Sequence, residues 1–210
     1  METSLIWKKL QLDRKKITTT EEIVRLAKDI NRDAKRSLHY LQEEDYILRI
    51  LRGIFYVKSI EERENKTYDH SIYEMIAMAL KEKGVKNWYF GLETALKLNL
   101  MTHEFYMIDY VITDSFRTTK VISIANQKFK FIKRAEKHFL NGIIREKKTR
   151  YSNPEKTILD LAYRNYLKNK NQKLYMNIFK EYECKINREN ALKLLQPYPK
   201  EFRNQVSVSI

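Results

Sequence analysis

The apolar positions near the N-terminus repeat with the spacing of two short helices. Residues 20–29 carry an apolar stripe, and Thr19 stands three residues before Glu22, which is the spacing of a capping box. A polar turn follows, and Asn31 is the expected N-cap of a second helix. The apolar face of that second helix consists of Ala34, Leu38 and Leu41. The pattern therefore predicts two helices joined by a tight turn.

Two β-rich runs follow these helices. Residues 46–51 and 54–58 flank an Arg-Gly pair, and a glycine-containing turn between two such runs predicts a hairpin. Winged helices often place Gly just before the first strand of this hairpin, whereas this chain has Asp45, which tolerates the left-handed conformation better than most residues. Residues 3–12 predict one further short helix. The order of elements in residues 1–60 is therefore that of a winged helix-turn-helix.

The outer face of the second predicted helix of the turn is basic. A helix-turn-helix places this helix in the major groove of DNA, so its outward side chains must donate hydrogen bonds to bases and phosphates. Charge runs are often only the solvated face of a helix, and that alternative stays open. The candidate DNA-binding residues are Arg32, Lys35, Arg36 and His39 on the helix, with Arg49 and Arg52 in the hairpin for phosphate or the minor groove.

The rest of the chain predicts a larger domain in which helices and strands are mixed. Residues 59–70 are polar and charged and are the expected linker, so this second domain spans 71–210 and begins with a helix at 71–83. The tail after Pro197 has no assigned element. Strands are expected at 87–91, 106–113, 120–125, 128–134 and within 141–151, and helices at 92–100, 154–167, 174–183 and 187–196. The expected fold class is α+β, with a small winged helix-turn-helix followed by a larger mixed α/β domain that has a short sheet and several helices.

The charge of the chain favours a polyanionic partner. The formal net charge is +14 and the pI is about 9.6. The densest basic stretch is 120–150, which holds ten Lys or Arg and two Asp or Glu. Such a balance is typical of proteins that bind nucleic acid.

This basic stretch contains a strand in which bases and aromatic residues alternate. Interleaved cations and aromatic rings suit RNA or single strands, because bases stack on the rings and phosphates pair with the cations. Strict alternation also fits a strand whose Phe residues are core and whose Lys residues are solvated. An RNA-binding protein that uses this surface is the alternative to DNA binding. The candidate residues are Lys128, Lys130, Lys133, Arg134 and Lys137, interleaved with Phe129, Phe131 and Phe139.

Other functions have little support in the sequence. No apolar run approaches 18 residues and no signal peptide is visible, so we expect a cytoplasmic protein without a membrane-spanning helix. The single cysteine, Cys184, excludes an internal disulfide and a Cys-rich zinc site. No phosphate loop, dinucleotide fingerprint, zinc-protease motif or nucleophile elbow occurs. We expect no enzyme, no cofactor and no metal, and a nucleic-acid enzyme with a scattered site is the third possibility.

Three features in sequence order resemble a known family. The winged helix pattern is followed by YFGLETALKLNL at 89–100 and then by the motif PEKTILD at 154–160. Together they are similar to the AbiEi-type antitoxins and related regulators over about residues 15–170. This resemblance implies a repressor that binds inverted repeats in its own promoter. It also implies a C-terminal domain that counters a nucleotidyltransferase-type toxin, without requiring the two proteins to bind each other.

The motif at 154–160 has a structural interpretation of its own. Pro154 and Glu155 suit the first turn of any helix. Thr157 and Asp160 are able to hydrogen-bond to a neighbouring loop and hold the helix against the sheet. We expect this structural role rather than chemistry.

Overall fold

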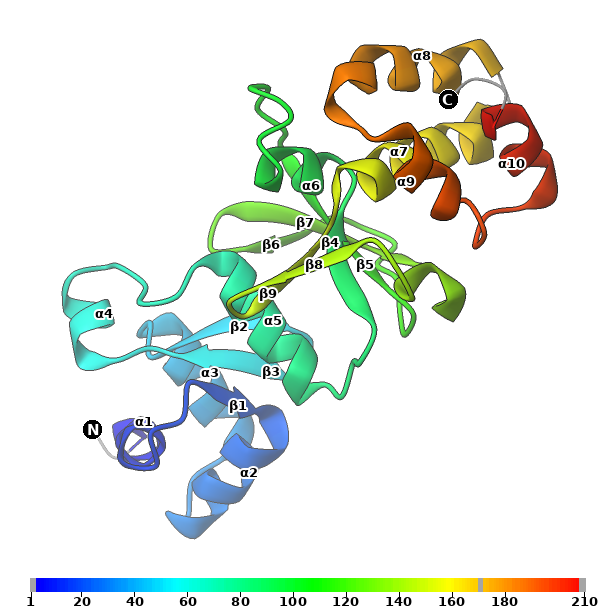
Figure 1. Cartoon of the computed structure of the whole chain (residues 1–210). Coiled ribbons are helices and arrows are strands. Elements are labelled where there is room, and N and C mark those ends of the chain that lie inside the picture. The colour runs from blue at the N-terminus through cyan, green and yellow to red at the C-terminus, as the bar shows by residue number, and fades with distance from the viewer. Residues whose placement is uncertain (1–2, 170–171, 208–210) are drawn as a thin grey trace. The chain divides into compact units, whose positions relative to one another are not determined.

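The computed structural model describes residues 3–169 and 172–207, and the chain divides into two compact units (Figure 1). The first unit holds residues 1–86 with 124–126, and the second holds 87–123 and 127–210. Helices and strands are mixed along the chain, which confirms the α+β class.

The first unit begins with the order helix, strand, helix, helix and two strands. Strand β3 pairs antiparallel with both β1 and β2, which gives the sheet order β1-β3-β2. The three-residue strand β1 was not predicted, whereas the other elements fall where the sequence pattern placed them. This order is compatible with the predicted winged helix-turn-helix. The elements are α1 Ser4–Leu12, β1 Ile17–Thr19, α2 Thr20–Asp29, α3 Ala34–Glu43, β2 Ile47–Leu51 and β3 Ile54–Val57.

The turn between α2 and α3 corrects one predicted cap. The N-cap of α3 is Asp33, whose carboxylate accepts a hydrogen bond from the backbone N–H of Arg36 at 2.8 Å. Asn31, the predicted cap, instead has a left-handed φ of 54° and lies in the turn that ends α2. The cap of α2 is as expected, because the Thr19 hydroxyl accepts from the N–H of Glu22 at 3.3 Å.

Both faces of the three-stranded sheet are covered. Phe55 and Val57 share a hydrophobic core with α1, α2 and α3. Ile54 and Tyr56 alternate with them along β3 and are also buried, because α5 Ile72–Glu82 packs against all three strands. The helix that was predicted to open the second domain therefore belongs to the first unit.

The segment expected as a linker is ordered inside the first unit. Ser59 begins the short helix α4 Ile60–Glu64, and its hydroxyl forms a capping box with Glu62. The division between the units lies between Lys86 and Asn87, whereas the sequence suggested 59–70.

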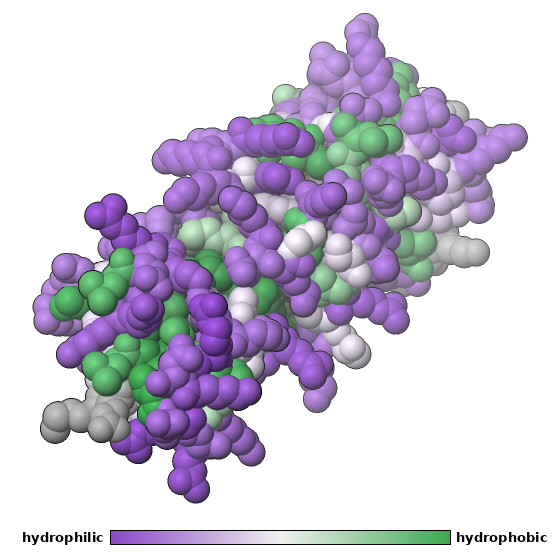
Figure 2. All heavy atoms as spheres, turned by 90° about the horizontal axis from the view of Figure 1, so that it is seen from below, coloured by the Kyte–Doolittle hydropathy of each residue, from purple (hydrophilic) through white to green (hydrophobic). Residues whose placement is uncertain are grey.

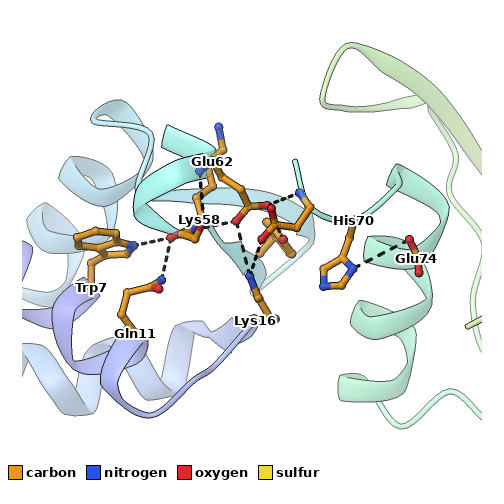
Figure 3. Close-up of polar contacts among 10 residues, drawn as sticks. Trp7, Gln11, Lys16, Lys58, Glu62, His70 and Glu74 are labelled. Atoms are coloured by element: carbon orange, nitrogen blue, oxygen red, sulfur yellow. Dashed lines mark hydrogen bonds and ion pairs between the residues drawn. The ribbon is translucent and has the colours of Figure 1, made fainter. Parts of the chain in front are cut away.

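The position before β2 behaves as the sequence suggested. Asp45 has a left-handed φ of 58°, and its carboxylate pairs with the Nζ of Lys58 at 2.6 Å. The carbonyl of Lys58 accepts hydrogen bonds from the Nε1 of Trp7 and the Nε2 of Gln11, both at 2.8 Å (Figure 3). The end of the hairpin is thus tied both to the turn after α3 and to α1.

The second unit is built on a six-stranded mixed sheet with the order β6-β7-β5-β4-β9-β8. Strand β5 runs antiparallel to β4 and parallel to β7, while β4 is parallel to β9. The segment 141–151, expected to hold one strand, provides the β8–β9 hairpin. The elements are β4 Trp88–Gly91, α6 Glu93–Leu98, β5 Ile108–Thr113, β6 Ile122–Ile124, β7 Gln127–Lys133, the 3-10 helix η1 Glu136–Phe139, β8 Ile143–Glu146 and β9 Thr149–Ser152.

The C-terminal helices share one core with this sheet. Helix α7 contacts α6, α8, α9 and β9, and its apolar residues lie in a cluster that also contains Tyr89 and Ile112. The tail, left unassigned by the sequence pattern, forms a helix that buries Phe202 and Val206 in that cluster. Of the predicted polar break at 168–173, Lys170 and Asn171 lie outside the described residues. The helices are α7 Pro154–Asn169, α8 Gln172–Tyr182, the 3-10 helix η2 Glu183–Lys185, α9 Arg188–Lys193 and α10 Lys200–Ser207.

Candidate nucleic-acid interface

The predicted base-reading residues lie on one exposed side of α3. Lys35, Arg36 and His39 are exposed on the side opposite the buried Ser37 and Leu41. Because side chains three and four residues apart are neighbours on a helix, His39 lies beside both cations. Arg32 is also exposed, immediately before the helix begins.

Two cations of this face, Lys35 and Arg36, carry charge that no acidic side chain of the described residues compensates. The Nδ1 of His39 lies 3.4 Å from a carboxylate oxygen of Glu43, and both side chains are about two-thirds exposed. Neither Lys35 nor Arg36 forms an ion pair with any acidic residue of the described parts of the chain. The face therefore carries positive charge that an anionic ligand would neutralise.

The hairpin residues are exposed as well. Arg49 projects from β2, and Arg52 occupies the two-residue turn before β3. The next residue, Gly53, has a left-handed φ of 76°, and its carbonyl accepts a hydrogen bond from the N–H of Thr20 at 3.0 Å. The turn is thereby held beside the first residue of α2, so Arg52 belongs to the helix-turn-helix side of the unit.

On the second predicted surface, along β7, the cations are exposed or half-buried, whereas two of the aromatic rings are fully buried. Phe129 and Phe131 are 0% and 1% exposed, so neither is available for base stacking. Lys128, Lys133 and also Lys137, which lies in η1, are exposed. The burial fits the alternative in which the Phe residues of this strand belong to the core, and Phe129 and Phe131 do not form a stacking surface.

A hollow that the sequence pattern did not indicate lies beside the C-terminal half of β7. It has a volume of about 530 Å³. The N–H of Thr118 donates to the carbonyl of Phe131 at 3.0 Å, and the N–H of Phe131 donates to the Thr118 hydroxyl at 3.1 Å. These bonds hold the loop after β5 against the strand. The lining residues are Arg117, Thr118, Thr119, Lys130, Phe131, Ile132, Lys133 and Arg134.

The molecular surface is otherwise strongly hydrophilic on the face shown in Figure 2, where apolar residues form separate patches among polar side chains. This agrees with the 41 Lys or Arg and 27 Asp or Glu of the chain. The one cysteine, Cys184, is exposed.

The motif at 154–160 has the structural role that was expected. The hydroxyl of Thr157 bonds to the backbone carbonyl of Asn153 at 2.7 Å, at the junction of β9 and α7. Asp160 is 3% exposed and accepts hydrogen bonds from the hydroxyls of Tyr89 at 2.9 Å and Tyr198 at 2.8 Å. The motif therefore joins α7 to strand β4 and to the segment before α10.

Two further ionisable groups are buried beside Asp160. Burial lowers the pKa of Lys156, and the Asp160 carboxylate, 3.7 Å from its Nζ, opposes this effect. Burial also lowers the pKa of His138 to about 4. The Nδ1 of His138 is buried and has no hydrogen-bond partner among the described residues. Its ring packs against Tyr163 and Tyr198.

The buried His138 predicts an acid-sensitive second unit. A free histidine titrates near 6.5, so between that pH and about 4 the unfolded chain binds a proton that the folded chain does not. The free energy of unfolding is therefore unaffected by His138 above about pH 6.5 and decreases as the pH falls from there toward about 4. Besides burial, the charge of Asp160 raises the pKa of His138, whereas the charges of Lys156, Arg134 and Lys137 lower it further.

We expect acidification from pH 7 to pH 5 to lower the free energy of unfolding of the second unit by about 2 kcal/mol through His138 alone. Urea unfolding of the wild type and of His138→Phe at both pH values measures this, because Phe keeps a ring against Tyr163 and cannot be protonated. The exposed His103→Phe is the control. An equal pH dependence in the wild type and His138→Phe would contradict the prediction.

Comparison with known proteins does not identify a family for this chain. No protein-family model matches this chain, and no curated protein matches its sequence. Within residues 3–169 and 172–207, no helix is long and apolar enough to cross a membrane, and no three His, Cys, Asp or Glu side chains group as a metal ion requires. The resemblance to AbiEi-type antitoxins thus rests on the three sequence features alone.

Proposed function

We propose that the first unit binds double-stranded DNA as a winged helix-turn-helix, with α3 in the major groove. The observation that carries this proposal is the exposed face of α3, on which Lys35 and Arg36 have no acidic partner in the described parts of the chain. The major groove admits a single helix, and Arg and Lys are the side chains that most often contact guanine there.

The frame around α3 supports the same proposal. The apolar side of α3 is fixed by Leu41 in the core, so the cations are presented from a rigid helix. The turn that carries Arg52 is bonded to the start of α2, and Arg49 lies exposed on the adjacent strand. These two arginines would contact phosphate or the minor groove beside the helix.

The regulatory part of the proposal rests on the resemblance. A protein of the AbiEi antitoxin type would repress its own operon by binding inverted repeats, and would counter a nucleotidyltransferase-type toxin. It would act in the cytoplasm, where promoter DNA is accessible. The motifs at 89–100 and 154–160 support this assignment through their order and spacing.

The decisive experiment is a titration of the DNA just upstream of this gene, with shuffled duplex as competitor. We expect Arg36→Ala to reduce the preference for the upstream sequence by about 1–3 kcal/mol if Arg36 contacts a base. An equal loss of affinity for both duplexes would indicate that Arg36 contacts phosphate. In that case the substitution should also reduce the salt dependence of binding, the slope of log K against log salt concentration, by about one.

The matched control is Arg188→Ala, which removes an exposed arginine from the second unit. This variant should keep the full preference for the upstream sequence. If the wild type binds the upstream and shuffled duplexes equally, the proposal of specific DNA binding is wrong.

A further inference from the structure

The hollow beside β7 arises because the strand has two different neighbours along one edge. Strand β6 has three residues and is joined to the seven-residue β7 by Ala125 and Asn126, which have φ of 46° and 66°. Two left-handed residues make a tight hairpin turn, so β6 reaches only the first half of β7. Thr118 pairs with the second half, and the loop that carries it forms one wall of the hollow.

The hollow is lined by cations and contains no carboxylate. Its charged residues are Arg117, Lys130, Lys133 and Arg134. None of these four forms an ion pair with an acidic side chain in the described part of the chain. Four neighbouring positive charges repel one another, so the arrangement favours an anion with several charges.

Two contacts fix donors at this site. The Arg134 guanidinium lies 4.9 Å from the centre of the Tyr163 ring, which restrains a side chain that is half-buried. The Thr118 hydroxyl already accepts from the N–H of Phe131, so its proton is left to donate to a second partner. Guanidinium, ammonium and hydroxyl donors together form the usual set that holds phosphate oxygens.

The spacing of the cations selects the ligand further. Lys130 lies on β7 and Arg134 directly follows the last residue of that strand, and four residues of extended chain correspond to about 13 Å. This length exceeds a single phosphate, and the volume of the hollow lies in the range of small-molecule sites. We propose that this hollow binds a chain of phosphates such as the triphosphate of a nucleotide, either free or at the 5′ end of an RNA.

The test is a calorimetric titration of the full chain at fixed salt with inorganic tripolyphosphate, ATP and two short RNAs of one sequence. One RNA carries a 5′-triphosphate and the other a 5′-hydroxyl. The variants are Arg117→Ala and Lys133→Ala, both at exposed residues of the hollow. The control is Lys128→Ala, an exposed lysine of the same strand that does not line the hollow.

We expect tripolyphosphate to bind the wild type and the control alike, and each hollow variant to bind about tenfold or more weakly. If the 5′-triphosphate RNA binds more tightly than ATP, the ligand is an RNA end. If the 5′-triphosphate RNA and ATP bind equally, the triphosphate of a free nucleotide is sufficient for binding. Either result supports the site. Failure of tripolyphosphate to bind, or equal weakening by Lys128→Ala, would each overturn the proposed site.

This outcome is independent of the DNA titration, because the hollow belongs to the second unit and Arg36 to the first. Thermal unfolding of each variant shows whether a lost affinity reflects a lost fold. A variant that unfolds is replaced by Arg117→Gln or Lys133→Gln, which removes the charge and keeps a long side chain.

Discussion

Asp160→Ala is expected to lower the free energy of unfolding of the second unit by about 3–5 kcal/mol. The substitution leaves the buried hydroxyls of Tyr89 and Tyr198 without an acceptor and the ammonium of Lys156 without its counter-charge. Burial raises the pKa of both phenols well above their ordinary value, so neither ionises in compensation. Urea unfolding followed by Trp88 fluorescence measures the loss.

The two tryptophans allow each unit to be followed separately, because Trp7 lies in the first and Trp88 in the second. Asp160→Ala and its reference should therefore both carry Trp7→Phe. The matched control is Asp114→Ala, a partly exposed carboxylate of the same unit that bonds to Asn87 at 2.7 Å. A loss for Asp160→Ala no larger than that for the control would contradict the proposed role of this carboxylate.

A double substitution separates the charge from the hydrogen bonds. In Asp160→Ala with Lys156→Met, no unpaired ammonium remains and the apolar volume of the lysine stem is kept. We expect this variant to unfold at higher urea than Asp160→Ala alone, because an isolated buried charge costs more than its absence. The difference that persists from the reference is the cost of the two unbonded phenols.

The first unit could be predicted because its signals are local. Helix α2 has its cap at Thr19, and the hairpin has Gly53 at the turn, so neighbouring residues determine both. The incorrect prediction of the N-cap of α3 also arises from relying on local signals. Asn31 and Asp33 are both good N-caps, and the sequence alone does not show that Asn31 is needed in the left-handed turn that ends α2.

The unit boundary and two elements depend on contacts that the local pattern does not contain. Strand β1 has three residues and exists because it pairs with β3. Helix α5 was correctly predicted as a helix, but its packing on the first sheet is not a property of its own sequence. Helix α10 did carry a signal, since Tyr198, Phe202 and Val206 recur every four residues.

The candidate sites divide in the same way. The exposed cations of α3 follow from the helical period once the buried face is known. The hollow joins Arg117 to Lys130 through a loop whose course no periodicity reveals. Asp160 accepts one hydrogen bond from Tyr89, 71 residues before it in the chain, and another from Tyr198, 38 residues after it.

Glu62→Ala is expected to lower the free energy of unfolding of the first unit by about 3 kcal/mol or more, because hydrogen bonds to a buried charged group are among the strongest in proteins. Glu62 is fully buried, and its oxygens accept from the Tyr56 hydroxyl at 2.6 Å, the N–H of Ser59 at 2.7 Å and the N–H of Asp69 at 2.8 Å. Figure 3 shows this carboxylate facing Lys16, whose Nζ lies 3.8 Å away.

Glu62→Gln distinguishes the charge of this side chain from its shape. The oxygen of Gln can still accept from Tyr56, but its amide group then presents donors to the N–H of Ser59 and to the ammonium of Lys16. We therefore expect Gln to recover only part of the loss, measured by Trp7 fluorescence in urea with Trp88→Phe in every chain. The exposed Glu64→Ala, from the same helix, is the control and should unfold as the reference does. Full recovery by Gln would show that the hydrogen-bonded shape suffices and that the negative charge of Glu62 does not stabilise the first unit.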